Sequence, residues 1–342
     1  MNDFKISKKK STYRKHKRQL LMFNTITSIV LAVCVFATAA LGLVAYTVSN
    51  MRHTDIIEEN VGISEEAKDL PKEIINIALF GIDSRSTKVE NLTEALSGRS
   101  DTIIILSINT IDKSIKMTSI LRDSWVPMLN SKRKPTTNKI NAAYSFGGAE
   151  NALRTVNTNF GLNITDYVAV NMQQMVRIVD ILDGDGLKVN ITPMEMRRIN
   201  ELSDNSEGFN SPPLTKHGLV KLNPVQAVCY TRIRDDSEET RVLRQQKILG
   251  MLFENAKNLS PAEYPAVLNK LLAFVETSLS FDDIYQFAPM LSISSLHLQT
   301  TAVPGKEVVA QGGIFEDTNG TWVWKYDIEK AKNYILKWIY GI

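Results

Sequence analysis

The stretch IINIALF, residues 74–80, is an apolar run that ends at Gly81. Its length and its isoleucine content predict a buried β-strand. Two similar runs follow over Thr102–Ile108 and Ser114–Leu121, with a turn at Asn109–Lys113 between them. The short connection favours antiparallel hairpin pairing, because a parallel crossover needs a dozen residues or more. The sequence therefore predicts a sheet in which these three strands are antiparallel neighbours.

The remaining patterns mix strands and helices without a strict βαβ alternation, and no internal repeat or low-complexity run interrupts them. Further strands are expected at Asp166–Val170, Leu187–Ile191, Gln299–Val303 and Trp322–Tyr326. Helices are expected at Asn141–Asn159, Met172–Leu182, from Pro193, Thr240–Asn258, Pro261–Thr277, Phe281–Leu291 and Asp327–Tyr340. Ser131–Asn138 and Ser203–Lys216 are expected to be loops, and Pro224–Tyr230 is either a short helix or a strand. These elements predict one α/β (α+β) domain over residues 72–342, with a central mixed sheet.

Composition excludes several classes of protein. The chain has 40 basic and 37 acidic residues, so its overall charge gives no reason to expect a nucleic-acid partner. Only two cysteines occur, Cys34 and Cys229, which rules out a disulfide framework. The four histidines are scattered and show no metal-ligand spacing.

A long uncharged segment lies between Arg18 and Arg52. Within it, Ile26–Val48 is almost wholly apolar and exceeds the roughly 20 residues that a bilayer-spanning helix needs. A signal peptide is the alternative, since Ala37–Ala39 resembles a cleavage site, but signal peptides have apolar runs of only about 7–15 residues. The basic block before the run predicts an anchor whose N-terminus is cytoplasmic.

This interpretation divides the chain into four parts and places most of it outside the cell. We expect a single-pass protein of the cell membrane, with substrates that are secreted, wall-borne or lipid-borne. The parts are a cytoplasmic basic tail (1–19), a transmembrane anchor (20–49), an extracellular stalk (50–71) and an extracellular catalytic domain (72–342).

Charged residues stand where the first three strands should end. Because these strands are predicted to be antiparallel neighbours, the end of the first, the start of the second and the end of the third meet at one sheet edge. The residues that this edge would gather are Asp83, Arg85, Arg99, Asp101, Arg122 and Asp123. Two carboxylates and several arginines suit a divalent metal and a diphosphate. The alternative is a set of ordinary ion pairs at strand ends.

A second cluster lies in YTRIRDDSEETRVLRQQ, residues 230–246. Arg232 and Arg234 are two apart, so they point to one side of an extended segment, and Arg241 and Arg244 are three apart, so they share a helix face. Guanidinium groups match phosphate oxygens in pairs, which favours a phosphate site. The alternative is a surface network in which neighbouring acids neutralise these arginines, namely Asp235, Asp236, Glu238 and Glu239.

Five segments, in order and spacing, resemble the LytR-CpsA-Psr family from about Leu70 to the end of the chain. They are NIALFGIDSR (76–85), GRSDTIIILSIN (98–109), SILRDSWV (119–126), KINAAYSFGG (139–148) and YTRIR…RVLRQQ (230–246). The resemblance implies a mixed sheet flanked by helices, with a hydrophobic tunnel for a polyprenyl chain. It also implies an Mg²⁺-assisted transferase. Such an enzyme moves a teichoic acid, capsular or related glycopolymer from a polyprenyl-pyrophosphate carrier to peptidoglycan.

The resemblance also implies roles for single residues. Asp83 and Asp101 correspond to the metal carboxylates. The pyrophosphate-holding residues are Arg99, Arg122, Arg232, Arg234 and Arg244, with Gln245 or Gln246 beside them, and the two clusters add Arg85 and Arg241. For catalysis we expect Arg122 to stabilise the leaving phosphate and either Asp101 or Asp123 to take the proton, although a metal-bound carboxylate is a poor base.

Two departures from the family pattern and two rival functions stay open. Ser237–Thr240 stands where the family often has Gly-Asp, and Ala142 stands where it often has histidine, which loosens expectations about the acceptor side. The same anchored domain could bind a wall precursor as a non-catalytic sensor or regulator of envelope gene expression. It could also hydrolyse the lipid pyrophosphate, with water as the acceptor.

Overall fold

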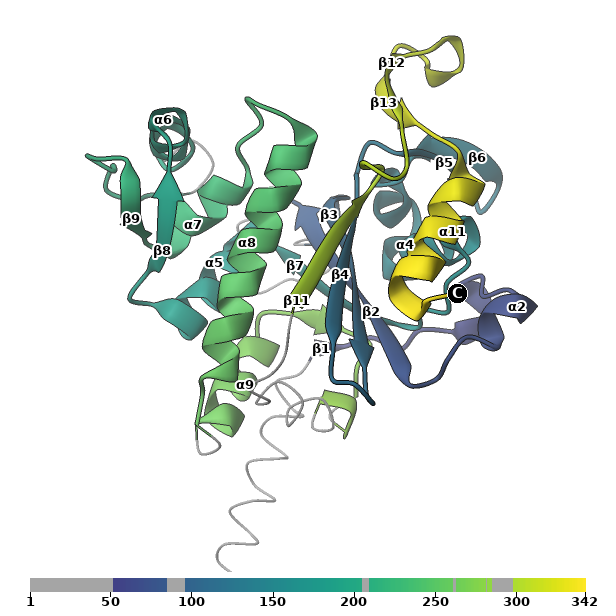
Figure 1. Cartoon of the computed structure of the whole chain (residues 1–342), viewed down its shortest axis with the longest axis horizontal. Coiled ribbons are helices and arrows are strands. Elements are labelled where there is room, and N and C mark those ends of the chain that lie inside the picture. Colours follow the sequence, from purple (N-terminus) through teal and green to yellow (C-terminus); the bar gives the residue numbers. More distant parts are fainter. Residues whose placement is uncertain (1–51, 85–95, 205–208, 261–262, 281, 285–297) are drawn as a thin grey trace, which may run out of the picture. The chain divides into compact units, whose positions relative to one another are not determined.

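The computed structural model describes residues 52–84, 96–204, 209–260, 263–280, 282–284 and 298–342 (Figure 1). The expected anchor at 20–49, the residue Arg85 and most of the expected helix at 281–291 lie outside these ranges. Within the described ranges, every helix is too short or too polar to cross a membrane.

A seven-stranded mixed sheet forms the centre of the fold, and this confirms the predicted architecture. In spatial order its strands are β1 (Arg52–His53), β10 (Glu276–Thr277), β7 (Asp166–Asn171), β2 (Ile74–Asp83), β3 (Arg99–Asn109), β4 (Ile115–Ile120) and β11 (Leu298–Val303). As predicted, β2, β3 and β4 are antiparallel neighbours. β7 pairs parallel to β2, and β11 pairs parallel to β4.

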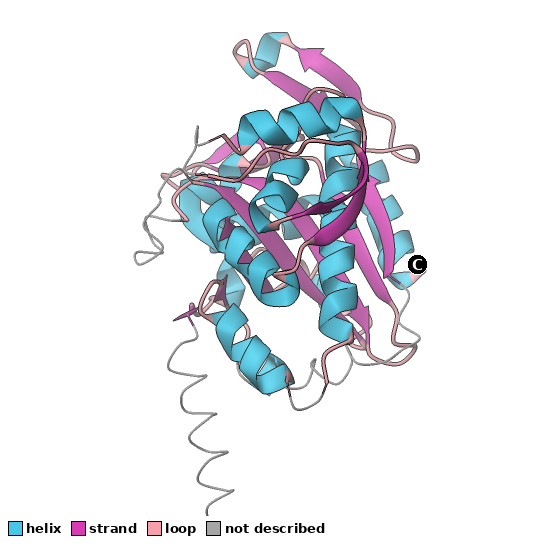
Figure 2. Cartoon of the chain, turned by 90° about the vertical axis from the view of Figure 1, so that its left-hand side faces the viewer, coloured by secondary structure: helices cyan, strands magenta, loops and turns pink. Residues whose placement is uncertain are grey.

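Helices cover both faces of this sheet (Figure 1). On one face lie α4 (Ala142–Phe160) and α11 (Ile328–Tyr340), whose apolar side chains form the main core with the strands. On the other face lie α5 (Met172–Asp183), α8 (Glu238–Lys257) and α9 (Tyr264–Leu272). In Figure 2, which views the molecule from the side that is on the left in Figure 1, cyan helices lie in front of the long magenta strands of the central sheet.

A second core lies beyond α5 and α8. It is formed by α6 (Pro193–Leu202), α7 (Pro224–Thr231) and a hairpin of β8 (Leu187–Ile191) with β9 (Gly218–Leu222). Two more hairpins pair β5 (Trp125–Leu129) with β6 (Pro135–Lys139), and β12 (Gln311–Ile314) with β13 (Trp322–Lys325). Short helices occur at η1 (Glu58–Asn60), α2 (Glu65–Lys68) and η2 (Glu316–Thr318).

Helix ends follow local chemistry, and this explains where several boundaries fall. Gly161 ends α4 in the left-handed conformation, at the predicted stop. Pro224–Tyr230, which the sequence left between helix and strand, is helical, because Asn223 and Gln226 form a capping box and Pro224 occupies the first helical position. α4 is interrupted at Gly147–Gly148, where the backbone leaves helical geometry.

Two expectations are wrong in detail. Ser131–Asn138 was expected to be a loop, but Pro135–Lys139 forms β6, because its threonines pair with β5 and Pro135 stands at the turn end of the hairpin. Pro261–Thr277 was expected to be one helix, but Glu276–Thr277 pairs with β7 at the sheet edge. In addition, no strand was predicted at β9, whose five residues pair with β8.

Candidate functional site

The site begins at an irregularity between β2 and β3. Gly81 pairs with Thr102, but the next residue, Ile82, pairs with Ser100, so Asp101 has no partner across the ladder. Such a β-bulge changes the direction in which side chains point and is common beside active sites. Gly81 is required here, because a Cβ atom at this position would lie 2.9 Å from Cβ of Thr102.

The bulge turns two consecutive side chains to the same face of the sheet. Asp101 and Thr102 both line a cavity, together with Ile104 further along the strand. Ile103, between them in sequence, packs in the core on the opposite face. In a regular strand, successive side chains alternate between faces, so Asp101 would point into that core. The bulge therefore directs the Asp101 carboxylate toward the cavity.

The cavity has a volume of about 360 Å³ and lies between the sheet and helices α5 and α8. Its wall is largely apolar and includes Leu79, Leu106, Met117, Val168, Ile178, Leu182, Leu249, Leu252, Phe253 and Leu298. Charged and polar side chains gather at the bulge end, namely Asp83, Asp101, Arg232, Arg234, Arg241 and Gln245.

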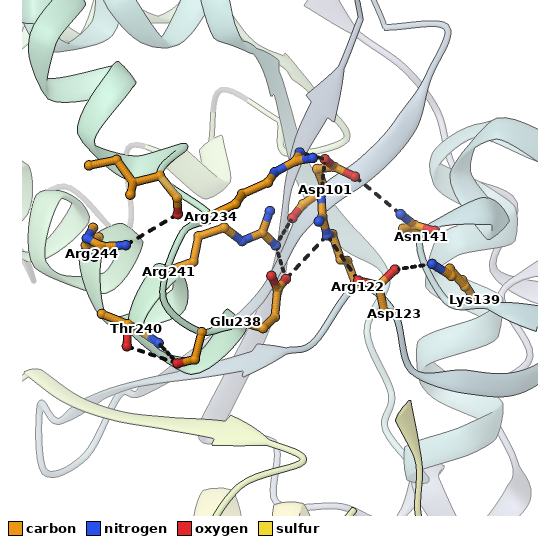
Figure 3. A network of polar contacts seen from close by, with 12 residues as sticks. Asp101, Arg122, Asp123, Lys139, Asn141, Arg234, Glu238, Thr240, Arg241 and Arg244 are labelled. Atoms are coloured by element: carbon orange, nitrogen blue, oxygen red, sulfur yellow. Dashed lines mark hydrogen bonds and ion pairs between the residues drawn. The ribbon is translucent and has the colours of Figure 1, made fainter. Parts of the chain in front are cut away.

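Asp101 is the centre of the polar end (Figure 3). Its Oδ2 accepts hydrogen bonds from Nη1 of Arg122 at 2.5 Å and from Nη2 of Arg234 at 2.8 Å. Its Oδ1 lies 3.3 Å from the side-chain amide of Asn141, and its backbone carbonyl accepts a hydrogen bond from Arg241 at 3.1 Å. Asp101 thus joins the sheet edge to both the α7–α8 loop and the first turns of α8.

Glu238, in the first turn of α8, holds two of these arginines (Figure 3). Its Oε1 lies 3.3 Å from Nε of Arg122 and also pairs with Nη2 of Arg241. From the sequence, Glu238 was expected only to neutralise the charge of nearby arginines. The signal for its place was the spacing Glu238–Arg241, which puts both side chains on one helix face.

The electrostatics favour an anion beside Arg241. Burial and the neighbouring positive charge of Arg122 lower the pKa of the Arg241 guanidinium to about 10. Burial also acts to lower the pKa of Arg122, but the carboxylates of Asp101, Glu238 and Asp123 outweigh it and raise that pKa above its ordinary value. Arg122 is therefore well neutralised, whereas Arg241 retains unfavourable positive charge that a phosphate would relieve.

Arg122 and Asp123 stand behind Asp101 and do not line the cavity. Asp123 forms an ion pair with Lys139 of β6 at 2.7 Å and lies 3.4 Å from Nε of Arg122 (Figure 3). A chain of charges therefore runs from the cavity through Asp101 and Arg122 to the β5–β6 hairpin.

Arg232 and Arg234 both reach the cavity, but not for the predicted reason. The segment was expected to be extended, whereas Arg232 caps the C-terminus of α7 with φ −99° and ψ −7°. The turn that follows, and not the two-residue repeat of a strand, brings both side chains to the cavity. The guanidinium of Arg232 also lies over the ring of Phe209, 5.6 Å from its centroid.

Arg244 is placed elsewhere, and the expectation that it shares a site with Arg241 is wrong. Its Nε donates to Glu195 of α6 at 2.8 Å and its Nη1 donates to Asp236 at 3.1 Å, while its side chain is 3% exposed. The two residues are three apart on one helix, but ion pairs with Glu195 and Asp236, and not contacts with the groups around Asp101, hold the Arg244 guanidinium. For Arg244, the ion-pair interpretation describes the observed geometry.

The other predicted residues divide between the cavity and its surroundings. Asp83 and Gln245 line the cavity. Gln246 is turned into the core, where its amide donates to Ser119 and Thr301. Arg99 pairs with Asp83 across the β2–β3 ladder but is exposed and does not line the cavity.

The donor set fits a hard divalent cation only with help from a substrate. Among the residues that the structure describes, no three His, Cys, Asp or Glu side chains cluster as a metal site. Asp83 and Asp101, however, lie at the same end of the cavity, and Mg²⁺ is commonly held by one or two carboxylates plus phosphate oxygens and water. The site can therefore hold an amphiphile with an apolar chain and a diphosphate head, with Mg²⁺ beside the head.

Comparison with known proteins gives matches over most of the chain. A family model described as the LytR_cpsA_psr family matches residues 41–337. A relative from Enterococcus faecalis, named polyisoprenyl-teichoic acid–peptidoglycan teichoic acid transferase TagU, is 30% identical over 222 residues. The match covers 64% of this chain and 65% of that protein, so it spans just under two thirds of the relative.

Two solved structures have a similar fold. A structure described as TagT bound to LI-WTA has a TM-score of 0.63 and 20% identity, and the match covers 85% of this chain and 100% of that one. A structure described as YwtF (TagT) with bound octaprenyl pyrophosphate lipid has a TM-score of 0.59, also with 20% identity and the same coverage.

Proposed function

Because this chain belongs to the LytR-CpsA-Psr family, we propose that it transfers an anionic glycopolymer from a polyprenyl-pyrophosphate carrier to peptidoglycan. The observation that carries the proposal is the apolar cavity with arginines at one end, which matches an amphiphile with an anionic head. The transferase name of the Enterococcus faecalis relative supports the reaction class, and the octaprenyl pyrophosphate bound to YwtF supports the ligand class.

The carrier would lie along α8. Its hydrocarbon chain would replace water against the apolar wall, which contributes roughly 25 cal/mol for each Å² of apolar surface buried. Its diphosphate would sit at Arg232, Arg234 and Arg241, whose guanidinium groups can pair with phosphate oxygens. Arg234 is the most adaptable of these, since its side chain is 52% exposed while it pairs with Asp101.

The transfer proposed is a displacement at phosphorus. An acceptor hydroxyl of the wall attacks the phosphorus attached to the glycan, and the bond to the bridging oxygen of the diphosphate breaks. The new bond is a phosphodiester between glycan and wall, and the leaving group is polyprenyl phosphate. Arg234 and Arg241 would stabilise the charge that develops on the leaving oxygen.

Arg122 would act through the groups it holds. It pairs with Asp101 and contacts Glu238, so it fixes the two carboxylates that orient Arg234 and Arg241. Neither candidate base is well suited to take a proton early, because Asp101 is held by two arginines and Asp123 by Lys139 and Arg122. A loose phosphoryl-transfer transition state needs little deprotonation of the nucleophile, so the hydroxyl proton would pass late in the step to Asp101, the candidate base that lines the cavity.

We also propose Mg²⁺ as the cofactor, held by Asp83 and Asp101 together with the diphosphate. When bound, it would neutralise phosphate charge during transfer. The segment 20–49 would anchor the chain in the cell membrane, with the described residues outside the cell, where lipid-linked polymer and peptidoglycan meet.

The decisive experiment uses the full-length protein in detergent. Mass spectrometry should find a polyprenyl phosphate or pyrophosphate on the wild type and little on Arg232→Ala/Arg234→Ala. Arg198→Ala is the matched control, because Arg198 pairs with Asp235 on the surface and does not line the cavity. Absence of lipid from a folded wild-type protein would contradict the proposal.

Product analysis then separates the three candidate functions. With a lipid-linked glycan and peptidoglycan supplied, a glycan–wall conjugate supports the transferase. Free phosphorylated glycan would instead indicate a lipid pyrophosphatase, and binding without turnover would indicate a sensor.

A further inference from the structure

Three of the four tryptophans of the chain gather on and beside one hairpin. Trp322 and Trp324 belong to β13, and Trp125 belongs to β5, against which β13 packs. The β12–β13 hairpin, here called the ribbon, stands out from the body of the domain above the β5–β6 hairpin (Figure 1). The pairing of the ribbon places Gly312 opposite Trp324 and Ile314 opposite Trp322, so these four residues share one face.

The exposed face of the ribbon is aromatic and uncharged. Trp322 is 40% exposed and Ile314 is 64% exposed. The indole rings of Trp322 and Trp324 meet edge to face, with centroids 4.9 Å apart and an angle of 82° between them. A Cβ atom on Gly312 would lie 2.6 Å from the Trp322 ring and 2.8 Å from the Trp324 ring. The rings therefore rest on bare backbone, which fixes their orientation.

The ribbon is attached to the charged site. The backbone N–H of Trp324 donates to the carbonyl oxygen of Asp123 at 2.9 Å, and Ser124 forms a parallel bridge with Trp324. Asp123 in turn contacts Arg122, which holds Asp101. The cavity lies at the Asp101 end of this chain of contacts and the ribbon lies at the other end. If the carrier lipid occupies the cavity, the ribbon side of the charged site is the side open to the second substrate, the acceptor glycan.

We propose that the face formed by Gly312, Ile314, Trp322 and Trp324 binds sugar rings of the acceptor glycan strand. The proposal rests on the transferase function proposed above. A pyranose ring presents a face of C–H bonds, which carry partial positive charge, and the face of an indole carries partial negative charge. The hydroxyl groups at the sugar rim stay in water, so an uncharged aromatic surface loses little by covering the ring.

Two other occupants fit the ribbon less well. A stable protein dimer buries about 800 Å² on each partner, far more than four side chains supply. A membrane surface is normally bound by basic residues combined with an apolar face, and the four residues of this face carry no charge. Both occupants remain distinguishable in the test.

The test is saccharide binding by the full-length protein in detergent, with an uncharged oligosaccharide of N-acetylglucosamine as the probe. Since most tryptophans surround the ribbon, binding should produce a saturable change in tryptophan fluorescence. Trp322→Ala should weaken the affinity roughly tenfold or more, whereas Trp322→Phe should retain most of it. Ile111→Ala is the control, because Ile111 is an exposed apolar residue in the β3–β4 turn and should not affect binding.

A transfer assay links the ribbon to turnover. Trp322→Ala should raise KM for the acceptor and leave the lipid that copurifies with the protein unchanged. If the transferase function is wrong but the ribbon binds sugar, saccharide binding survives and no conjugate forms with any variant.

Three results would overturn the proposal. The first is a failure of the binding test: either the Trp322→Ala variant binds the saccharide as tightly as the wild type does, or the wild type does not bind it. The second is a change of oligomeric state in Trp322→Ala, which would make the ribbon a protein interface. The third is that Trp322→Ala loses binding to anionic phospholipid vesicles while its saccharide binding is unchanged, which would make the ribbon a membrane-binding surface.

Discussion

Arg234 donates a hydrogen bond to Asp101 across 133 residues of sequence, with 2.8 Å between Nη2 and Oδ2. The two partners differ in exposure, since the Arg234 side chain is 52% exposed and the Asp101 side chain is 17% exposed. Asp101 is therefore the fixed partner, held also by Arg122, and Arg234 can turn toward a phosphate at small cost. The charges of Asp101 and Arg234 are thus paired before a substrate arrives.

Replacing Asp101 by Asn should separate binding from transfer. The amide keeps the shape of the side chain but removes the charge that Arg122 and Arg234 share, so these arginines should hold a diphosphate at least as tightly. Transfer should fall on the order of 100-fold, because the arginines and any Mg²⁺ lose their common anchor. Lipid content and conjugate formation measure the two effects. Asp112→Asn, in an exposed turn, is the control, and full transfer by Asp101→Asn would contradict this site.

Two arginines of α8 should behave in opposite ways. Arg244→Ala leaves Glu195 without its buried partner and should lower the free energy of unfolding by about 3–5 kcal/mol. Arg241→Ala relieves repulsion from Arg122, so it should cost less stability but weaken lipid binding. Urea unfolding and copurified lipid measure both. If instead Arg244→Ala weakens lipid binding and costs little stability, Arg244 belongs to the pyrophosphate site.

Affinity for a diphosphate lipid should fall as the pH rises through about 10. The pKa of Arg241 is lowered to about 10 by burial and by Arg122, and a bound phosphate favours the protonated form. The contribution of Arg241 to lipid affinity is therefore fully present below about pH 10 and is lost as the pH rises above that value. Since the unfolded pKa is higher, the same titration raises folding stability above pH 10, so unfolding through this group does not explain the loss. Lipid titrations from pH 8 to 11 test this, and Arg241→Gln should show no such step.

A methyl group on Gly81 should disturb the bulge. The new Cβ would lie 2.9 Å from Cβ of Thr102, so Gly81→Ala should lower the free energy of unfolding by about 1–3 kcal/mol and misplace Asp101. Gly250→Ala is a matched contrast. Gly250 lies inside helix α8, and a Cβ atom there would make an ordinary 3.4 Å contact with Leu298 of β11. That change should stabilise the protein by about 0.5–1 kcal/mol. Equal effects in thermal melts would show that the close approach at Gly81 is unimportant.

Filling the cavity should exclude the lipid while preserving the fold. Leu249 lines the cavity, so Leu249→Trp should abolish lipid copurification and leave the lipid-free protein equally or more stable. Leu243→Trp is the control, since Leu243 lies on the same helix and is 61% exposed. Undiminished lipid in Leu249→Trp, with the protein folded, would place the lipid outside this cavity.

The sheet and its charged edge could be predicted because they depend on local patterns. The apolar runs predicted the order and direction of β2, β3 and β4, and hence that Asp83 and Asp101 lie at the same end of the sheet. The bulge could not be predicted, because it depends on how two strands pair and not on the composition of either. The family resemblance supplied the role expected of Asp101 as a metal ligand, which pairing rules alone did not.

The arginine cluster was predicted only in part, because distant residues decide where each side chain goes. Arg244 is drawn to Glu195, which lies 49 residues earlier on another helix. Leu249 and Phe253 line the cavity, but their apolar spacing looks the same as that of a helix packed in a core. The family resemblance implied a hydrophobic tunnel, but the residues that line the cavity could be identified only from the structure.

Helix α8 carries both ends of the cavity, from Arg241 at the charged end to Ala256 at the apolar end. At 1.5 Å per residue, this stretch of helix measures about 22 Å. If the proposed carrier lipid binds in this cavity, the number of turns of α8 between these two residues limits the length of straight hydrocarbon that fits beside the helix. A carrier with a longer chain must fold back or emerge from the protein, and adding or removing one turn of α8 would change that limit by about 5 Å.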